Sequence, residues 1–231
     1  MKLAERIILA LDMHIEERLK ALLDQLPDLA FVKVGMELFY SMGPDLVKWL
    51  KDRGLKVFLD LKVHDIPNTA YAAIHVLSQL GCDMLNLHCA GGLAMMQRAR
   101  EGLVGDTKLL GVTQLTSIDQ AALNEQLRIS GTMEDCVLHY AALAKTAGLH
   151  GVVCSPREAA MLKERFGKDF ITVTPGIRPS SSDVGDQKRT LTPQEAIRSG
   201  SDYLVIGRPI TASPDPRKAF EQILEEIEVV E

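Results

Sequence analysis

The chain has 231 residues, ordinary shares of apolar (46%) and charged (25%) residues, and a formal net charge of −5. This charge disfavours binding to nucleic acid through bulk electrostatics, although a local basic pocket can still hold a small anion. No apolar run reaches the roughly 18 residues of a membrane span and no signal-peptide pattern opens the chain, so we expect a cytoplasmic protein without membrane or nucleic-acid partners.

Short apolar runs alternate with amphipathic stretches from one end of the chain to the other. The apolar runs predict eight strands, at Arg6–Asp12, Ala30–Gly35, Lys56–Lys62, Met84–His88, Leu109–Leu115, Gly151–Cys154, Phe170–Pro175 and Tyr203–Gly207. The amphipathic stretches predict a helix after each strand, at Ile15–Gln25, Pro44–Arg53, Asn68–Leu80, Leu93–Gly102, Met133–Ala147, Pro156–Phe166, Pro193–Ser199 and Pro216–Ile227.

Strands that alternate with helices form a parallel sheet, and eight such units favour a closed barrel. We therefore predict an α/β fold in which residues 1–231 form a single (β/α)8 TIM barrel domain. The alternative is an open doubly wound sheet, which usually carries a glycine-rich turn after its first strand. Here the first strand ends Ala-Leu-Asp-Met-His, without a glycine. Two long loops, Ser117–Thr132 and Gly176–Arg189, are candidate lids or binding segments.

The most informative segment runs from Phe58 to Asn68 and contains Asp60, Lys62 and Asp65. Residues 60 and 62 are two apart, so on a strand they point to the same side. Charged groups gathered at the end of an apolar strand are costly to desolvate unless they pair. The segment is therefore either an ion-pair cluster or a functional site.

Further polar residues stand at the predicted C-terminal strand ends, where the active site of such a barrel lies. They are Asp12, Lys33, Asn86, His88, Gln114, Thr116, Ser117, Arg178 and Arg208. Lys33 interrupts an apolar strand, and pairing with Asp60 would make its burial tolerable; the alternative is a salt bridge without catalytic use.

An anion site is predicted where the seventh and eighth strands end. Gly207 allows close backbone approach and Arg208 offers a charged fork, as in barrel phosphate sites. Arg178 and Gln187 lie on the long seventh loop and are candidates to clamp the same anion. The alternatives are a surface arginine after a turn and a solvated loop.

The sequence predicts no metal ion and no redox centre. The four cysteines form no Cys-x-x-Cys pair, so we expect reduced, packed thiols. There is no His-x-His or Glu-x-x-His array that would indicate zinc.

These motifs together resemble the orotidine 5′-phosphate decarboxylase family in its bacterial form. The matching stretches, in family order, are Ala10–Asp12, Phe31–Gly35, Asp60–Pro67, Gln114–Ser117, Thr174–Arg178 and Ile206–Arg208. The resemblance covers essentially the whole chain. It implies decarboxylation of orotidine 5′-monophosphate (OMP) to UMP, the last step of de novo pyrimidine synthesis, without metal or organic cofactor. It also implies a homodimer with shared active sites.

The resemblance also implies roles for individual residues. Lys62, Asp60, Lys33 and, from the partner, Asp65 would form the catalytic array, and the segment Asp65–Thr69, including Ile66 and Thr69, would reach into the neighbouring site. The remaining substrate contacts would come from Asp12 and Lys33 at the ribose, Thr116 and Ser117 at the pyrimidine, and Arg178, Gln187, Gly207 and Arg208 at the phosphate or lid. Ser180, Ser181 and Ser182 receive no assignment.

Two other functions compete with this one. A Mg²⁺-dependent 3-keto-gulonate-phosphate decarboxylase or hexulose-phosphate synthase on the same barrel would carry an acidic ligand where this chain has Lys33, and a lysine there repels a divalent ion. A non-catalytic nucleotide-binding barrel would keep the phosphate loop but have little use for Asp60 beside Lys62.

Overall fold

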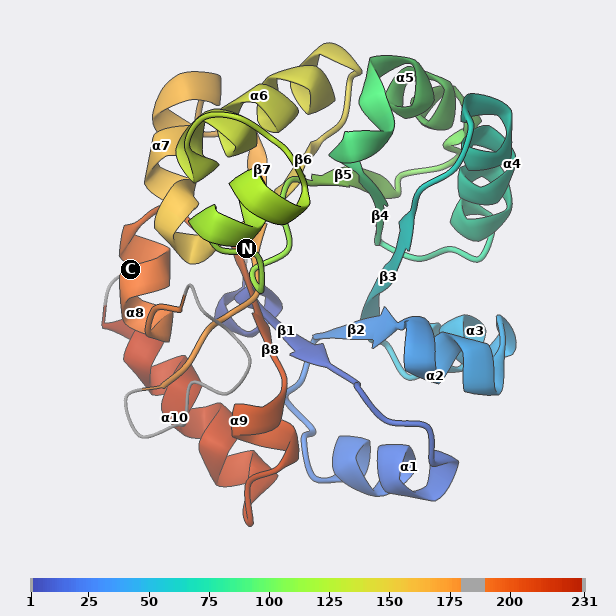
Figure 1. The fold of residues 1–231 in the computed structure, drawn as a ribbon. Helices are drawn as coiled ribbons and strands as arrows, with labels where there is room; N and C mark the ends of the chain where they lie inside the picture. The colour runs from blue at the N-terminus through green and yellow to red at the C-terminus, as the bar shows by residue number, and fades with distance from the viewer. Residues whose placement is uncertain (1, 180–189, 230–231) are drawn as a thin grey trace.

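The structure, a computed structural model, describes residues 2–179 and 190–229 and contains a closed barrel of parallel strands in the order β1 to β8. The strands form the inner ring and the helices the outer ring (Figure 1). The strands are β1 (Ile7–Ala10), β2 (Phe31–Gly35), β3 (Lys56–Val63), β4 (Met84–His88), β5 (Lys108–Val112), β6 (Gly151–Val153), β7 (Ile171–Thr174) and β8 (Tyr203–Ile206). The predicted barrel and all eight predicted strands are confirmed.

The predicted helices are also present, with small shifts at their ends. They are α1 (Glu16–Asp24), α3 (Asp45–Asp52), α4 (Pro67–Ser78), α5 (Gly92–Gly102), α6 (Met133–Thr146), α7 (Ala159–Phe166), α8 (Pro193–Arg198) and α10 (Pro216–Glu228). The sequence pattern missed α2 (Met36–Met42) and α9 (Arg208–Thr211), which begin within two residues of the ends of β2 and β8, with no loop to separate them. The loop after β5 holds a π-helical turn, η3 (Ala122–Gln126).

Two apolar clusters explain why the strands read as continuous apolar runs. One, between the sheet and the helices, takes residues such as Ile7 and Leu9. The other takes the alternate residues, which fill the inside of the barrel: Ile8, Ala10, Phe31, Phe58, Met84, Leu110, Val173 and Val205. Both faces of each strand are therefore buried, as expected for a parallel barrel.

The inward-facing positions change from apolar to polar along β2, β3 and β4. Two residues beyond Phe31, Phe58 and Met84 of the inner cluster stand Lys33, Asp60 and Asn86. Because side chains on a strand alternate between two faces, these polar groups continue the same inward columns toward the C-terminal ends. The fold therefore gathers them at one end of the barrel.

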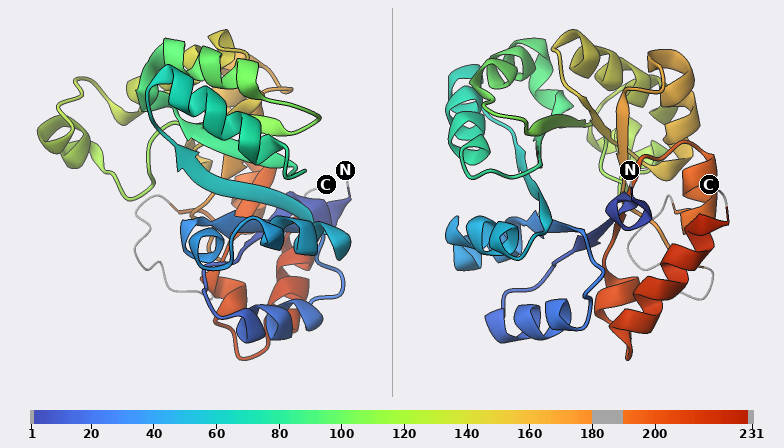
Figure 2. Two further views of the ribbon diagram at one scale, coloured as in Figure 1. Left: turned by 90° about the vertical axis from the view of Figure 1, so that its right-hand side faces the viewer. Right: turned by 180° about the vertical axis from the view of Figure 1, so that it is seen from behind.

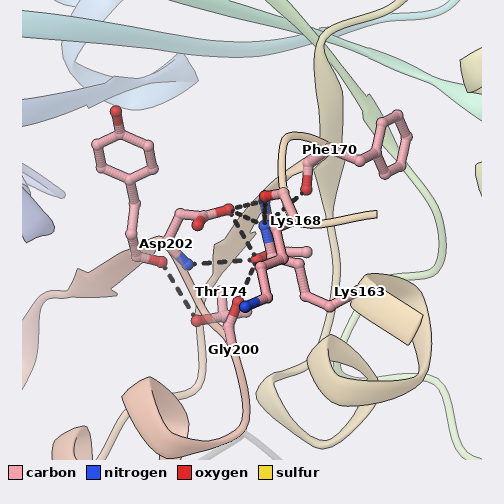
Figure 3. A network of polar contacts seen from close by, with 8 residues as sticks. Lys163, Lys168, Phe170, Thr174, Gly200 and Asp202 are labelled. Carbon is pink, nitrogen blue, oxygen red and sulfur yellow. Dashed lines mark hydrogen bonds and ion pairs between the residues drawn. The ribbon is translucent and has the colours of Figure 1, made fainter. Parts of the chain in front are cut away.

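The other end of the barrel carries the start of the chain and a group of ion pairs. The short turn η1 (Leu3–Arg6) lies there beside β1, β2 and β8, as the view from behind shows (Figure 2, right). Beside it, Lys163 Nζ donates to the carbonyls of Lys168 (2.9 Å) and Phe170 (2.8 Å) and to Asp202 Oδ2 (2.5 Å), which also accepts from Thr172 N (Figure 3). All three ammonium hydrogens of Lys163 have acceptors, so this ammonium group has no hydrogen-bond donor left for a ligand. The cluster links β7 to the start of β8.

Two further features concern the chain as a whole. The four cysteines are reduced and buried, as predicted. Among the described residues, no helix is both long and apolar enough to cross a membrane.

Candidate active site

Asp60 is the centre of a charged cluster at the C-terminal end of the barrel. Its Oδ1 accepts from Lys62 Nζ at 2.7 Å and from Asn86 Nδ2 at 2.6 Å, and its Oδ2 lies 3.3 Å from Lys33 Nζ. Only 11% of its side chain is exposed. A buried carboxylate with three donors is well satisfied, and both of its oxygens are held in place.

Lys33 joins this carboxylate to a second acid, Asp12, which lies two residues after the end of β1. Its Nζ donates to Asp12 Oδ1 at 3.0 Å, while its own side chain is 11% exposed. A side chain at Gly35 would press on this pair, because a Cβ there would stand 3.2 Å from Lys33 Nζ and 3.5 Å from Asp12 Oδ1. The predicted pairing of Lys33 with Asp60 is confirmed, and Asp12 is an additional partner.

The backbone departs from regular strand geometry at Lys62. This residue has a φ of 51°, a left-handed conformation that is uncommon for residues other than glycine. The pairing of β3 with β4 shifts register between Leu59 and Val63. The Lys62 ammonium nevertheless contacts Asp60, so the two side chains share a side as predicted although the strand is irregular there.

Lys62 differs from Lys163 in the number of ammonium hydrogens that already have an acceptor. Among the described residues, Asp60 is the only hydrogen-bond acceptor of Lys62 Nζ. The lysine lines a cavity, and 26% of its side chain is exposed. An ammonium group has three donors, so Lys62 keeps hydrogen-bonding capacity for a ligand. The Asp60–Lys62 cluster therefore has the properties of a site.

The cavity has a volume of about 490 Å³, which suits a drug-sized or nucleotide-sized ligand. Its polar and glycine lining combines residues from several strand ends: Asp12, Lys33, Asp60, Lys62, Gln114, Thr116, Ser117, Gly176, Arg178, Gly207 and Arg208. The acids and lysines of β1–β3 thus share one cavity with the arginines that follow β7 and β8. One cavity therefore contains arginines that could bind an anion and a charged cluster that could act on a reacting group.

The pKa values of Asp60 and Lys33 are both shifted by the charged groups around them. Burial alone would raise the pKa of Asp60, but Lys33, Lys62 and Asn86 outweigh it and lower that pKa. Burial alone would lower the pKa of Lys33, but Asp60 and Asp12 outweigh it and raise that pKa. At neutral pH the site therefore holds an ionised carboxylate between two ammonium groups.

This pairing predicts a pH-dependent contribution to stability. Because the pKa of Asp60 is lowered on folding, its contribution is present above the ordinary aspartate pKa and is lost as the pH falls through the folded value. At pH 7 we expect Asp60→Asn to lower the free energy of unfolding by about 3 kcal/mol, since it leaves two ammonium groups without their shared charge. The difference from wild type should shrink between about pH 5 and pH 3 in urea titrations.

Asp52→Asn is the matched control, because Asp52 pairs with Lys48 on the surface and its side chain is 63% exposed. We expect at most about 1 kcal/mol from this variant at any pH. A gap for Asp60→Asn that stays constant down to pH 3 would contradict the lowered pKa.

Most of the residues predicted from the sequence line the cavity. Thr116 is buried in its wall, and Ser117 and Arg208 are more exposed. Gln187, like Ser180, Ser181 and Ser182, lies outside the described residues. Asp65, Ile66 and Thr69 are exposed and do not line this cavity; Asp65 Oδ1 accepts from Ile66 N at 2.7 Å.

The sequence pattern placed Asn86 among the polar residues at the strand ends but gave it no role; in the structure it contacts both Asp60 and the Lys62 backbone. Its place, two residues after the inward-facing Met84, is the signal that could have pointed to a contact inside the barrel. In the described part of the chain, no group of three or more His, Cys, Asp or Glu side chains could hold a metal ion.

Comparison with known families agrees with this arrangement. The sequence model of the orotidine 5′-phosphate decarboxylase / HUMPS family matches residues 5–223. The chain belongs to this family. The orotidine 5′-phosphate decarboxylase / HUMPS family match spans all eight strands and every cavity residue named above.

Named relatives within the family are similar over nearly the whole chain. Orotidine 5′-phosphate decarboxylases of Streptococcus suis and Streptococcus pneumoniae are 49% and 50% identical over 223 residues, which is 96% of each chain. The crystal structure of orotidine 5′-phosphate decarboxylase from Lactobacillus acidophilus superposes with a TM-score of 0.84 at 44% identity, covering 96% of this chain and 98% of that one.

Proposed function

We propose that this protein is an orotidine 5′-phosphate decarboxylase, which converts OMP to UMP and CO₂ in the last step of de novo pyrimidine synthesis. Family membership favours this activity. The observation that carries it is the Lys62 ammonium, 2.7 Å from a buried carboxylate and on the wall of a nucleotide-sized cavity.

The chemistry requires a cation and a proton at one carbon atom. When the bond between C6 of the pyrimidine and its carboxylate breaks, CO₂ leaves and the electron pair stays on C6, in the plane of the ring. That orbital is poorly delocalised, so the anion needs a fixed positive charge nearby. Lys62 supplies this charge and then donates its proton to C6, which yields UMP.

Asp60 and Lys33 prepare the site for this step. Asp60 would stand beside the substrate carboxylate, where a second negative charge disfavours the bound substrate relative to the state that has lost CO₂. Lys33, held between Asp12 and Asp60, keeps Asp60 ionised and in place. An array whose charges are already paired needs little rearrangement during the reaction.

The other end of the cavity suits the 5′-phosphate. Gly207, Arg208 and Arg178 line it and would bind the phosphate, together with Gln187 of the seventh loop. Asp12 and Lys33 would bind the ribose hydroxyls, and Thr116 and Ser117 the pyrimidine. Because the phosphate is far from the reacting bond, its contacts supply binding energy that can position the ring.

Arg208→Ala is expected to weaken substrate capture much more than the chemical step. The loss of a charge-assisted contact costs about 1.5–3 kcal/mol, which corresponds to a fall in kcat/KM of roughly 10- to 150-fold. Arg217→Ala, on the exposed side of α10, is the control because Arg217 pairs with Glu221 on the surface, outside the cavity lining. Steady-state kinetics with OMP check this, and an unchanged kcat/KM would place the phosphate elsewhere.

We also propose that two subunits share their active sites. Each residue from His64 to Thr69 is exposed, and Ile66, at the start of α4, is 68% exposed. Met36 (44%) and Tyr40 (71%), which follow β2, are exposed apolar neighbours in the same half of the barrel. A partner subunit would cover these apolar groups and place its Asp65 beside Lys62 of the first subunit.

One assay tests the activity and separates it from the Mg²⁺-dependent alternatives. Loss of orotate absorbance with OMP as substrate should proceed at the same rate in EDTA, because Lys33 occupies the place where those enzymes carry an acidic metal ligand. Activity that vanishes in EDTA and returns with Mg²⁺ would favour the sugar-phosphate lyases. Binding of OMP without turnover would favour a non-catalytic barrel. The cytoplasmic location remains a prediction from the sequence.

A further inference from the structure

Asn86 is buried in the charged cluster and uses both ends of its side-chain amide there. Its side chain is almost inaccessible, with 1% of the residue exposed. Nδ2 donates to Asp60 Oδ1 at 2.6 Å, and Oδ1 accepts from the backbone N–H of Lys62 at 2.8 Å. One neutral side chain from β4 therefore contacts the carboxylate and the backbone of the two charged residues on β3.

The contact with Lys62 falls at the irregular point of the strand. Lys62 has a φ of 51°, and the ladder between β3 and β4 changes register on either side of it. A backbone N–H that leaves the ladder needs another acceptor when it is buried, and Asn86 provides one. A left-handed residue persists only where its surroundings hold it, so this bond helps to fix the direction of the Lys62 side chain.

The contact with Asp60 fixes the other partner. Asn86 donates to the same oxygen that receives Lys62 Nζ, and its hydrogen bond is one of the interactions that lower the pKa of Asp60. A leucine of similar size would fill the space but leave the carboxylate short of a donor and the Lys62 N–H without an acceptor.

We infer that Asn86 is a positioning residue for the reaction, which holds Asp60 and Lys62 in their productive relative geometry through the two ends of one amide group. The inference rests on the proposed function. Because Asn86 lies beside the reacting groups and not beside the arginines of the phosphate end, its loss should reduce kcat and leave KM for OMP little changed.

Kinetics of Asn86→Leu with OMP test the inference. We expect kcat to fall by roughly 100-fold, since small displacements of catalytic groups have effects of this size, and KM to stay within about threefold. Thr172→Val is the matched control: Thr172 is fully buried at the other end of the barrel and bonds to Gly200 O and Asp202. It should lower the melting temperature and keep kcat within about twofold of wild type.

Asn86→Asp provides a second readout that a packing role would not produce. An ionised carboxylate at this position repels Asp60, whereas a protonated one donates to it as the amide does. The ratio of its kcat to that of wild type should therefore rise as the pH falls from about 8 to about 5, while the ratio for Asn86→Leu stays flat. The charged groups around Asn86 are Asp60 and Lys62 on β3, Lys33 on β2 and Asp12 after β1. His88 on β4 is a further titratable group, and it interacts electrostatically with Lys62 and Asp60.

Several outcomes would overturn the inference. They are a cooperatively melting Asn86→Leu protein with kcat within about threefold of wild type, a loss confined to KM, or an Asn86→Asp ratio that does not change with pH. Wild-type protein is assayed first, because its failure to decarboxylate OMP would remove the proposed function itself, whereas active wild type with active Asn86→Leu removes only the role of Asn86.

Discussion

Lys62→Ala is expected to lower kcat for OMP decarboxylation by roughly 10⁴-fold or more while UMP still binds. The lysine is asked to stabilise the developing charge on C6 and to deliver the proton, and each role is typically worth 10²-fold or more. Binding of UMP depends mainly on the phosphate and ribose ends of the cavity, which this substitution leaves intact. Single-turnover kinetics and titration calorimetry with UMP measure the two quantities separately.

Lys56→Ala is the matched control for this experiment. Lys56 lies on the same strand at the opposite end of the barrel, where it pairs with Glu5 at 2.8 Å and its side chain is 42% exposed. Its removal should leave kcat unchanged. If purified Lys62→Ala turned over OMP at a rate close to wild type, Lys62 would be neither the cation nor the proton donor.

Mixing two inactive variants is expected to restore activity if the sites are shared between subunits. Lys62→Ala removes the lysine from a subunit's own site, whereas Asp65→Ala removes the acid that it lends to its partner. In a mixed dimer one site carries both defects and the other carries none. Random pairing of equal amounts should then give about a quarter of wild-type activity after the subunits have exchanged.

The controls are the activity of each variant measured alone and the oligomeric state of each protein. Each variant alone should be nearly inactive, and sedimentation should show dimers before and after mixing. A mixture no more active than its parents, although the subunits have exchanged, would mean that each site is built from one chain. An Asp65→Ala protein with full activity would remove Asp65 from the catalytic array.

Much of the barrel could be predicted because its local rules are strong. Runs such as Ile7–Leu11 read as buried parallel strands, and β4 has the predicted bounds of Met84–His88. The predictions missed α2 and α9, which follow β2 and β8 with at most one residue between, so no loop in the sequence marks where they begin. The loop after β5 was predicted to be long, but its π-helical turn depends on contacts that no local pattern specifies.

The sequence predicted which charged residues form the site better than it predicted how they are arranged. The spacing of Asp60 and Lys62 indicated that their side chains lie on the same side of the strand. Lys33, a charged residue inside an otherwise apolar strand, was predicted to pair with Asp60. The left-handed turn at Lys62 and the bridging amide of Asn86 were not predictable, because a bulge arises from the pairing of two particular strands. The sequence also named Asp12 without indicating its bond to Lys33.

Residue type and spacing along one chain are enough to predict the alternation of strands and helices, the polar residues at the strand ends and the family to which they belong. They do not predict that all three ammonium hydrogens of Lys163 have acceptors while Lys62 lines a cavity with hydrogen-bonding capacity left. Each of the two lysines forms an ion pair with an aspartate. They differ because Lys163 also donates to two backbone carbonyls, whereas Lys62 does not within the part of the chain that the structure describes. That arrangement exists only once the barrel has closed.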